Sequence, residues 1–483
     1  MQYRSIIRIL GLLIGIFSIT MIPPAFVAYW YNDGAGVPFM LSFLLSLLIG
    51  FVIWYPNRQY KAELKVRDGF LIVVLFWTVL GTVGSIPLML ASNPQLSVAG
   101  AMFEAFSGLT TTGATVLTGI EFLPKAILFY RQQLQWLGGM GIIVLAVAIL
   151  PMLGVGGMQL YRAETPGPVK DNKMTPRIAD TAKHLWYIYL ALTLSCMLAF
   201  YLAGMNWFDA ICHAFSTVAI GGFSTYDASI GHFQSPVINA ICVIFLLLSA
   251  VNFPLHFAAI RGKSVSTYFR DPEFKAFLII QAALVLICFF VLLETNVYRT
   301  TAEALNHGIF QAVSISTTAG FATDSFAVWP LFLPILLIFS SFIGGCAGST
   351  GGGLKVVRVV LLFLQGTREL NRLIHPRAVY AIKLGRRAVP DRIVEAVWGF
   401  FAAYALVFVV TMLLLLLTGL DNITAFTATA ACLNNLGPGL GEVAANFGSI
   451  PDSSKWILIV AMVFGRLEIF TLLVLFTPAF WKD

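Results

Sequence analysis

Four short stretches of the sequence combine threonine, asparagine, alanine and glycine between long apolar runs. They read LTTTGAT, AIGGFST, TTAGFAT and NNLGPGLG, and each contributes one glycine to an alignment: Gly113, Gly222, Gly320 and Gly437. None contains a carboxylate, which disfavours a Ca²⁺ site. Carbonyls from four such strands can replace the hydration shell of a cation, and glycine reaches the backbone angles that this requires without steric cost. The stretches therefore predict a site for a large, weakly hydrated monovalent ion, which K⁺ fits best.

The four stretches occupy equivalent places in an internal repeat. Their glycines recur about every 100 residues, and such fixed-period similarity in a membrane protein implies pseudo-symmetry. Each stretch follows a segment of about three helical turns, which is too short to span a bilayer. Non-helical backbone at membrane depth persists only where protein buries it or where it lines water. Each segment is therefore expected to enter the membrane as a short helix and to return as an extended strand that lines one central pore.

Composition identifies the chain as a polytopic membrane protein. It has 483 residues, of which 58% are hydrophobic and 11% charged, whereas soluble domains carry about 25% charged residues. Ten apolar spans are expected near residues 6–30, 37–55, 69–91, 126–153, 184–204, 235–260, 274–293, 330–365, 391–419 and 454–477. The predicted fold is all-α, with an N-terminal two-helix hairpin and four pseudo-symmetric helix–pore helix–filter–helix repeats around one pore. The predicted domains are 1–68 for the hairpin and 69–161, 162–262, 263–366 and 367–483 for the repeats.

Basic residues predict how the chain is oriented. Lys and Arg cluster in loops on the side that holds the N-terminus, at 58–67, 162–183, 261–275 and 355–392. Because cytoplasmic loops carry the excess of Lys and Arg, both termini are expected in the cytoplasm, and this topology accounts for the net charge of +7 without a nucleic-acid partner. The opposite side carries acidic residues, among them Glu104, Asp209, Asp227, Asp324 and Asp421. They either solvate ordinary loops or form an anionic vestibule that concentrates cations.

A second glycine-rich stretch, GGCAGSTGGG at residues 344–353, interrupts the apolar span 330–365. Each glycine costs a helix about 1 kcal/mol relative to alanine, so the helix is expected to break there and to leave a loop within the membrane. The loop would lie below the filter strand of its own repeat and obstruct the pore; close helix packing through small residues is the alternative. A nucleotide-binding P-loop is excluded because the Gly-Lys-Ser/Thr ending is missing. The candidate gate residues are Gly344, Gly345, Gly348, Ser349, Thr350, Gly351, Gly352 and Gly353.

Arg466 is a charged residue deep within the last apolar span. It lies about 12 residues into the span, or roughly 18 Å at about 1.5 Å per residue, near the bilayer midplane. A charge at this depth is costly and suggests a function, and Glu468 is too close in sequence to share its helical face. Arg466 is therefore a candidate gate residue that contacts the loop carbonyls or places positive charge in the inner half of the pore; a structural ion pair is the alternative. Arg131, nearer the outer end of its span, is expected to hold the filter scaffold.

Other kinds of chemistry find little support in the sequence. The six cysteines and six histidines are dispersed, without a CxxC pair or an HExxH motif, and no nucleophile–base set converges, so neither a metal cluster nor an enzyme is predicted. No nucleotide-binding domain is recognised, so no organic cofactor is expected on this chain. Glu468 is the only acidic residue placed well inside a span and away from its ends, which favours a passive pore over symport of K⁺ with H⁺ or Na⁺.

Taken in order along the whole chain, these motifs resemble the Trk/Ktr/HKT superfamily of potassium transporters. The stretches GGMGIIVLAVAILP, GGCAGSTGGGLKV and FGRLEIFTLLVLF are similar, more specifically, to those of bacterial Trk membrane subunits. The resemblance implies low- to medium-affinity K⁺ uptake across the bacterial inner membrane by a homodimer with one pore per subunit. It also implies a cytoplasmic partner, TrkA, a ring of regulatory domains that bind NAD(H) and adenine nucleotides. The basic residues 355–392 are a candidate docking segment for that ring.

The resemblance also assigns the filter residues. It places the K⁺-coordinating carbonyls, to within one residue, at and just before each aligned glycine: Thr111, Thr112, Gly113, Ile220, Gly221, Gly222, Thr318, Ala319, Gly320, Asn435, Leu436 and Gly437. The second and fourth strands, AIGG and NNLG, depart from the TxG pattern, which implies imperfect fourfold symmetry and lower selectivity than in a tetrameric channel. In HKT relatives, serine in place of the first filter glycine accompanies Na⁺ transport, so the four glycines present here favour K⁺.

Overall fold

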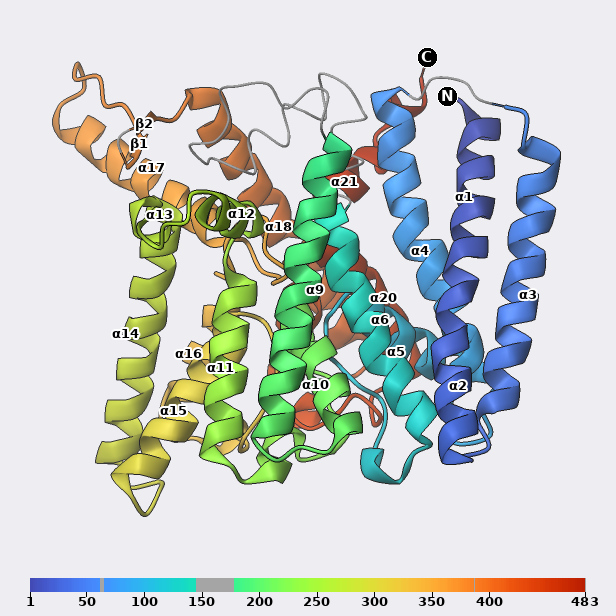
Figure 1. The fold of residues 1–483 in the computed structure, drawn as a ribbon. Coiled ribbons are helices and arrows are strands. Elements are labelled where there is room, and N and C mark those ends of the chain that lie inside the picture. Colours follow the sequence, from blue (N-terminus) through green and yellow to red (C-terminus); the bar gives the residue numbers. More distant parts are fainter. Residues whose placement is uncertain (61–64, 145–177, 386, 483) are drawn as a thin grey trace.

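The computed structural model describes residues 1–60, 65–144, 178–385 and 387–482, and these are almost entirely helical (Figure 1). The predicted all-α membrane fold is thereby confirmed. The predicted span 126–153 and the basic segment 162–183 lie partly outside the described residues. The boundaries proposed between the hairpin and the repeats stay predictions.

The N-terminal hairpin packs its two arms against each other and against repeat one. Its elements are α1 (Tyr3–Ser18), η1 (Ile19–Met21), α2 (Ile22–Tyr31), α3 (Gly36–Trp54) and η2 (Tyr55–Asn57). The arms approach closely because both carry glycine: a Cβ on Gly50 would lie 2.7 Å from the backbone nitrogen of Gly15. Asp33, in the turn between the arms, accepts a hydrogen bond from the N–H of Ala126 at 2.8 Å. This bond attaches the hairpin to the helix that follows the first filter strand.

Each of the four repeats contains a long helix, a short pore helix and a second long segment. Repeat one consists of α4 (Val66–Leu90), α5 (Val98–Leu109) and α6 (Lys125–Val144), and repeat two of α9 (Ile178–Leu202), α10 (Trp207–Ala219), α11 (Pro236–Ala250) and α12 (Phe253–Arg261). Repeat three consists of α14 (Pro272–Glu294), α15 (Thr301–Ser316), α16 (Leu333–Ser341) and α17 (Val356–Ile374), and repeat four of α18 (Asp391–Leu417), α19 (Asn422–Leu433), α20 (Asp452–Arg466) and α21 (Phe470–Leu473). The pore helices are α5, α10, α15 and α19.

Within the described residues, three of the predicted spans are broken by a sharp bend or by a non-helical stretch. The segment 235–260 bends by 92° between α11 and α12, where Asn252 caps a new helix whose second residue is Pro254. The segment 330–365 is interrupted between α16 and α17, at the glycine-rich stretch. The segment 454–477 bends by 108° between α20 and α21, a break that the sequence did not predict. In the part of the chain that the structure describes, six helices are long and apolar enough to span a membrane, or up to eight if each bent pair is one span.

Both termini lie at one end of the bundle, together with α12, α17, α13 (Ser266–Arg270) and two antiparallel strands of two residues each (Figure 1). The strands are β1 (Lys383–Leu384) and β2 (Arg387–Ala388), and the chain closes with α22 (Pro478–Trp481). The basic segments 261–275 and 355–392 belong to this end, as the predicted topology requires. Which side of the membrane this end faces stays a prediction.

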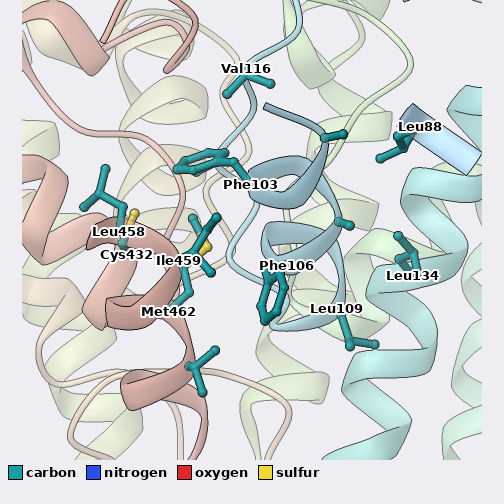
Figure 2. Packing of buried hydrophobic residues seen from close by; sticks show 14 of the residues in the cluster. Leu88, Phe103, Phe106, Leu109, Val116, Leu134, Cys432, Leu458, Ile459 and Met462 are labelled. Carbon is teal, nitrogen blue, oxygen red and sulfur yellow. The ribbon is translucent and has the colours of Figure 1, made fainter. Parts of the chain in front are cut away.

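The pore helix α5 is packed on several sides by apolar side chains (Figure 2). Phe103 and Phe106 of α5 belong to one buried cluster with Leu88 of α4, Leu134 of α6 and Met462 of α20. Because lipid tails are as apolar as these side chains, van der Waals packing rather than the hydrophobic effect holds such helices together. Close packing therefore fixes the position of the pore helix, and with it the filter strand that follows.

Candidate ion pathway

Each pore helix starts with a side chain that caps its first turn. Ser97, Asn206 and Thr300 each accept a hydrogen bond from the backbone N–H three residues later. Asp421 accepts bonds from the hydroxyl and the backbone N–H of Thr424, and these bonds lower the pKa of Asp421. Such caps set where each helix begins and therefore where its C-terminal end meets the filter strand. The partial negative charge at that end favours a cation.

The four filter strands share one backbone conformation. The aligned glycines have φ angles of +80°, +78°, +78° and +100°, and the residue two places earlier is also left-handed, with φ of +54°, +54°, +69° and +53°. These left-handed pairs are Thr111 and Gly113, Ile220 and Gly222, Thr318 and Gly320, and Asn435 and Gly437. In every repeat the N–H between the pair donates to the carbonyl five residues back, at 2.7–2.8 Å. The AIGG and NNLG strands therefore keep the fourfold backbone although their sequences depart from TxG.

Each filter glycine also faces a carbonyl of a neighbouring repeat. A Cβ added to the glycine would lie 2.1, 2.0, 2.1 and 2.8 Å from that oxygen, far inside van der Waals contact. The pairs are Gly113 with the oxygen of Gly221, Gly222 with that of Ala319, Gly320 with that of Leu436, and Gly437 with that of Thr112. The four contacts close a ring. The structure thus brings the twelve predicted filter residues together, with the carbonyl that precedes each glycine packed against the next strand.

A cavity of about 560 Å³ lies beyond the aligned glycines, among the loops that follow them. Asp227 and Asp324 line this cavity. Glu104 and Asp209 do not, because both are buried; Asp209 accepts the hydroxyl hydrogen bond of Tyr226 at 2.8 Å. Both alternatives that the sequence left open, ordinary loop solvation and an anionic vestibule, are therefore wrong for Glu104 and Asp209. Their carboxylates belong to the scaffold around the filter.

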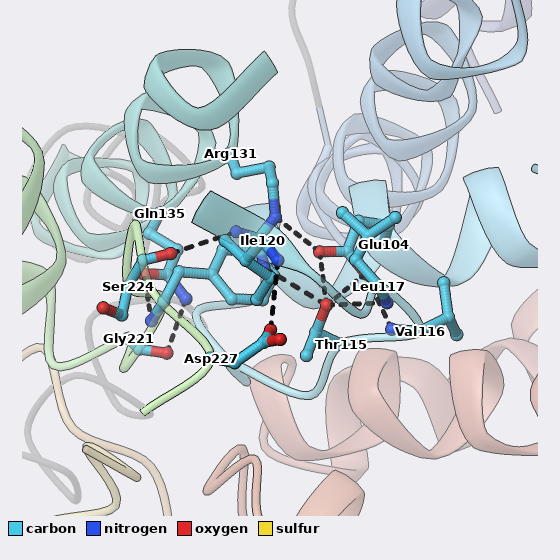
Figure 3. Close-up of polar contacts among 11 residues, drawn as sticks. Glu104, Thr115, Val116, Leu117, Ile120, Arg131, Gln135, Gly221, Ser224 and Asp227 are labelled. Atoms are coloured by element: carbon cyan, nitrogen blue, oxygen red, sulfur yellow. Dashed lines mark hydrogen bonds and ion pairs between the residues drawn. The ribbon is translucent and has the colours of Figure 1, made fainter. Parts of the chain in front are cut away.

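A buried ion pair supports the segments that leave the filter strands of repeats one and two (Figure 3). Nε of Arg131 donates to Oε1 of Glu104 at 2.7 Å, and the two side chains are 1% and 0% exposed. Arg131 also donates to the carbonyl of Ser224 and the hydroxyl of Thr115, both at 3.2 Å. Glu104 accepts the N–H of Val116 at 2.9 Å. The sequence predicted this supporting position for Arg131 but not its partner.

Two side-chain amides hold the strands that depart from TxG. Gln135, one turn beyond Arg131 on α6, donates from Nε2 to the carbonyl of Gly221 and accepts the N–H of Phe223 at Oε1, at 3.1 Å (Figure 3). Nδ2 of Asn435 donates to the hydroxyl of Thr112 at 2.9 Å, which joins strand four to strand one. Sequence reasoning missed Gln135 altogether. A buried glutamine on an apolar helix was the only available signal, and spacing does not show that it faces a filter strand.

The glycine-rich loop 344–353 lies directly against the inner ends of the filter strands. The N–H of Gly352 donates to the hydroxyl of Thr318 at 2.7 Å, and the N–H of Gly353 donates to the carbonyl of Asn434 at 3.1 Å. A Cβ on Gly352 would lie 1.9 Å from that carbonyl oxygen, so only glycine permits the approach. The loop therefore reaches two filter strands from the end opposite the cavity.

Arg466 is 5% exposed and contacts the loop from α20. Its Nη1 donates to the carbonyl of Thr350 at 3.2 Å and its Nη2 to the carbonyl of Gly138 at 3.0 Å. The guanidinium also lies 5.5 Å from the ring centre of Trp77. Among the described residues Arg466 forms no ion pair, so the contact with a loop carbonyl that the sequence suggested fits better than the structural ion pair.

Glu273 accepts hydrogen bonds both from the loop and from the start of α17, and sequence reasoning missed it. Its Oε1 accepts the N–H of Ala347 at 2.7 Å and that of Val357, in the first turn of α17, at 3.2 Å. The residue is 5% exposed. The fold is needed to show that the loop of the same repeat returns to this carboxylate.

Four capped pore helices lead into a ring of backbone carbonyls, and a loop packs against the inner side of that ring. This arrangement is that of a membrane protein of the cation-transport class. The chain belongs to the TrkH family, described as cation transport protein, whose profile matches residues 35–483. Membership in a transport family confirms the prediction that the chain is not an enzyme.

Relatives of the same family match over the full length. The chain is 67% identical to the Trk system potassium uptake protein TrkH of Vibrio parahaemolyticus serotype O3:K6 and 64% identical to that of Escherichia coli strain K12, covering 100% of both chains in each case. It is similar to the crystal structure of the potassium transporter TrkH from Vibrio parahaemolyticus with a TM-score of 0.93 and 64% identity, again covering 100% of each chain. The chain is therefore a multi-pass membrane protein with the fold of that structure.

The carbonyl ring yields a prediction for the filter glycines. Gly222→Ala adds a methyl group onto the carbonyl of Ala319 and forces alanine into a left-handed conformation. We expect the preference for K⁺ over Na⁺ to fall about tenfold or more, since about 1.4 kcal/mol of differential binding is a factor of ten. The measurement is K⁺ and Na⁺ flux into proteoliposomes. Gly204→Ala is the matched control, because Gly204 has φ +107° but open space around its Cβ; an equal loss in both variants would attribute the effect to backbone strain alone.

Proposed function

We propose that this chain is the ion-conducting membrane subunit of a bacterial K⁺ uptake system of low to medium affinity. The observation that carries the proposal is the closed ring of four carbonyl contacts, which brings neutral oxygens and no carboxylate together where the four filter strands meet. Such a ring suits a weakly hydrated monovalent cation. The full-length similarity to proteins named potassium uptake proteins supports K⁺ as the ion.

The loop 344–353 acts as a gate in this proposal, and the conformation described is the closed one. Its N–H groups occupy the Thr318 hydroxyl and the Asn434 carbonyl, and Arg466 adds a positive charge beside it. A cation leaving the filter inward meets both a steric and an electrostatic barrier. Passive conduction is favoured over symport with H⁺ or Na⁺, because Glu468, the one acidic residue predicted well inside a span, is paired with Arg358 and not placed as a proton relay.

We further propose that the chain works as a homodimer in the bacterial inner membrane, with both termini in the cytoplasm. A TrkA-like cytoplasmic ring that binds NAD(H) and adenine nucleotides would open the gate. The relatives' names place them in a Trk system, which supports the existence of partner subunits. The basic segments 261–275 and 355–392 share one end of the bundle with the termini, which supports a cytoplasmic location for that end (Figure 1).

The ion and the mechanism can be tested together by electrical recording of the purified protein in a bilayer. Under a K⁺ gradient with symmetric H⁺ and Na⁺, we expect the reversal potential to match the K⁺ equilibrium potential. Adding an H⁺ gradient should leave it unmoved, whereas a shift would favour coupled symport. Recording Arg466→Ala in parallel keeps the test informative if the wild-type gate stays closed without its partner.

The contacts of Arg466 predict that Arg466→Ala raises K⁺ flux. The change removes two hydrogen bonds from a charged donor, and such bonds contribute about 1.5–3 kcal/mol each, so an increase of about tenfold or more is expected. The measurement is K⁺ uptake into proteoliposomes that contain equal amounts of folded protein. Arg372→Ala, on an exposed part of α17, is the control. Unchanged flux in a folded Arg466→Ala variant would exclude a role in the gate.

The anchoring of the loop by Glu273 predicts a similar gain. Glu273→Ala frees the N–H groups of Ala347 and Val357 from their shared acceptor, and we expect K⁺ flux to rise about tenfold. Glu273→Gln keeps a neutral acceptor oxygen and should give a smaller increase in the same assay. Glu294→Ala, at the exposed end of the same helix, should leave flux unchanged. A fall in flux in Glu273→Ala at normal thermal stability would contradict the anchoring role.

A further inference from the structure

A second buried arginine near the loop is not part of the predicted gate. Arg358 lies in the first turn of α17 and is 8% exposed. Its Nη2 donates to Oε2 of Glu468 at 2.5 Å, and its Nη1 donates to the carbonyl of Leu354 at 3.3 Å. The guanidinium also lies 4.3 Å from the ring centre of Phe400 on α18. Arg358 thus contacts three chain segments. They are its own segment, which directly follows the loop, the segment that contains Glu468, and α18.

The carboxylate partner sits in the break of the last span. Glu468 and Ile469 have φ angles of +53° and +52°, and the helices on either side are bent by 108°. Two successive left-handed residues without glycine are sparsely populated, and a β-branched one is a genuine outlier, so surrounding contacts must hold them. The bond to Arg358 is a contact of this kind. It fixes the backbone two residues after Arg466, and therefore the position of Arg466 at the end of α20.

Two cationic side chains close to the Arg358–Glu468 pair contact the loop. Lys355, three residues before Arg358, donates from Nζ to the carbonyl of Gly351 at 2.7 Å. Arg466 donates to the neighbouring carbonyl of Thr350. The loop is therefore contacted by two cationic side chains, one from the start of α17 and one from the end of α20. The Arg358–Glu468 pair joins the two backbone segments that carry them.

We propose that Arg358 and Glu468 are positioning residues that keep the loop closed by locking α17 to the break between α20 and α21. The proposal rests on the function of the loop as a gate. Neither residue needs to touch the ion. While the pair is intact, Lys355 and Arg466 hold the loop together; once it is broken, α17 and the break move independently and the loop loses both contacts. Because α17 extends to the edge of the bundle at the end that holds the termini, a displacement of this helix reaches the gate through Arg358 (Figure 1).

Two neutral substitutions separate this role from simple electrostatics. Arg358→Gln removes a positive charge near the inner pore, and Glu468→Gln removes a negative one, so a purely electrostatic effect on a cation would raise flux in the first and lower it in the second. Loss of the lock raises flux in both. We expect basal K⁺ uptake into proteoliposomes of the full chain to increase about fivefold or more in each, the usual scale of conformational coupling. The double variant should match the larger single effect, because both changes remove the same interaction.

A matched control lies further along the same helix. Arg368 of α17 is also buried and pairs with Asp391 of α18, which is not part of the break. Arg368→Gln should leave uptake unchanged. If Arg358→Gln does not fold, Arg358→Lys, which keeps the charge but loses the planar contact with Phe400 and the carboxylate, must give the increase instead.

The outcomes distinguish this inference from the proposed function. Changes of K⁺ uptake in opposite directions in Arg358→Gln and Glu468→Gln would overturn the lock and leave an electrostatic effect on the ion as the explanation. Unchanged uptake in both, with increased uptake in Arg466→Ala, would overturn the lock and retain the gate. Unchanged uptake in all three would overturn both. An increase in Arg368→Gln equal to that in Arg358→Gln would show that α17 only needs to be stable, and would also overturn the specific role of the pair.

Discussion

The contact between each filter glycine and the carbonyl of the next repeat is the constraint on which the rest of the structure depends. A side chain at any of the four positions would occupy the space of an oxygen that lies 2.0–2.8 Å from the Cβ position. The ring is therefore only as wide as four bare backbones allow. Holding backbones at this distance without a side-chain spacer requires that every strand be fixed from outside the ring. The capped pore helices, the five-residue return hydrogen bonds and the packed surroundings of α5 all act in that way.

The fourfold symmetry holds for the backbone of the filter strands but not for the side chains that support them. The strands repeat the same φ pattern, but each is supported by different side chains: Arg131 and Glu104 behind strand one, Gln135 beside strand two, and Asn435 between strands four and one. Buried polar groups are costly unless they are hydrogen-bonded, so each support must be satisfied within its own surroundings. One chain can vary these supports repeat by repeat, which four identical subunits cannot do. Departures from TxG in sequence are thus compensated locally, and all four strands keep the same φ pattern.

How far the sequence could predict this molecule depends on whether a residue acts through its backbone or through its side chain. The filter glycines were predictable because they recur at regular intervals, and the loop glycines because many of them interrupt one apolar span. In both cases the chemistry is the absence of a Cβ. The place of Glu104 in the scaffold was not predictable, because its partner Arg131 is 27 residues away on another helix and periodicity carries no such information. The break at Glu468 and Ile469 was missed for a related reason. Neither residue favours a left-handed conformation, so only tertiary contacts that outweigh local preference produce it.

A loop at membrane depth can serve as a gate only if both of its positions satisfy its polar backbone. In the conformation described, the N–H groups of Gly352 and Gly353 bind the Thr318 hydroxyl and the Asn434 carbonyl, so the loop and the inner ends of the filter strands saturate each other. In the proposed gate, movement of the loop would turn both sets of groups toward the pore, where water that enters can bond to them instead. The exchange replaces hydrogen bonds within the protein by hydrogen bonds to water, so the two positions of the loop differ little in free energy. Contacts from outside the loop, such as those of Glu273 and Arg466, are then large enough to decide between them.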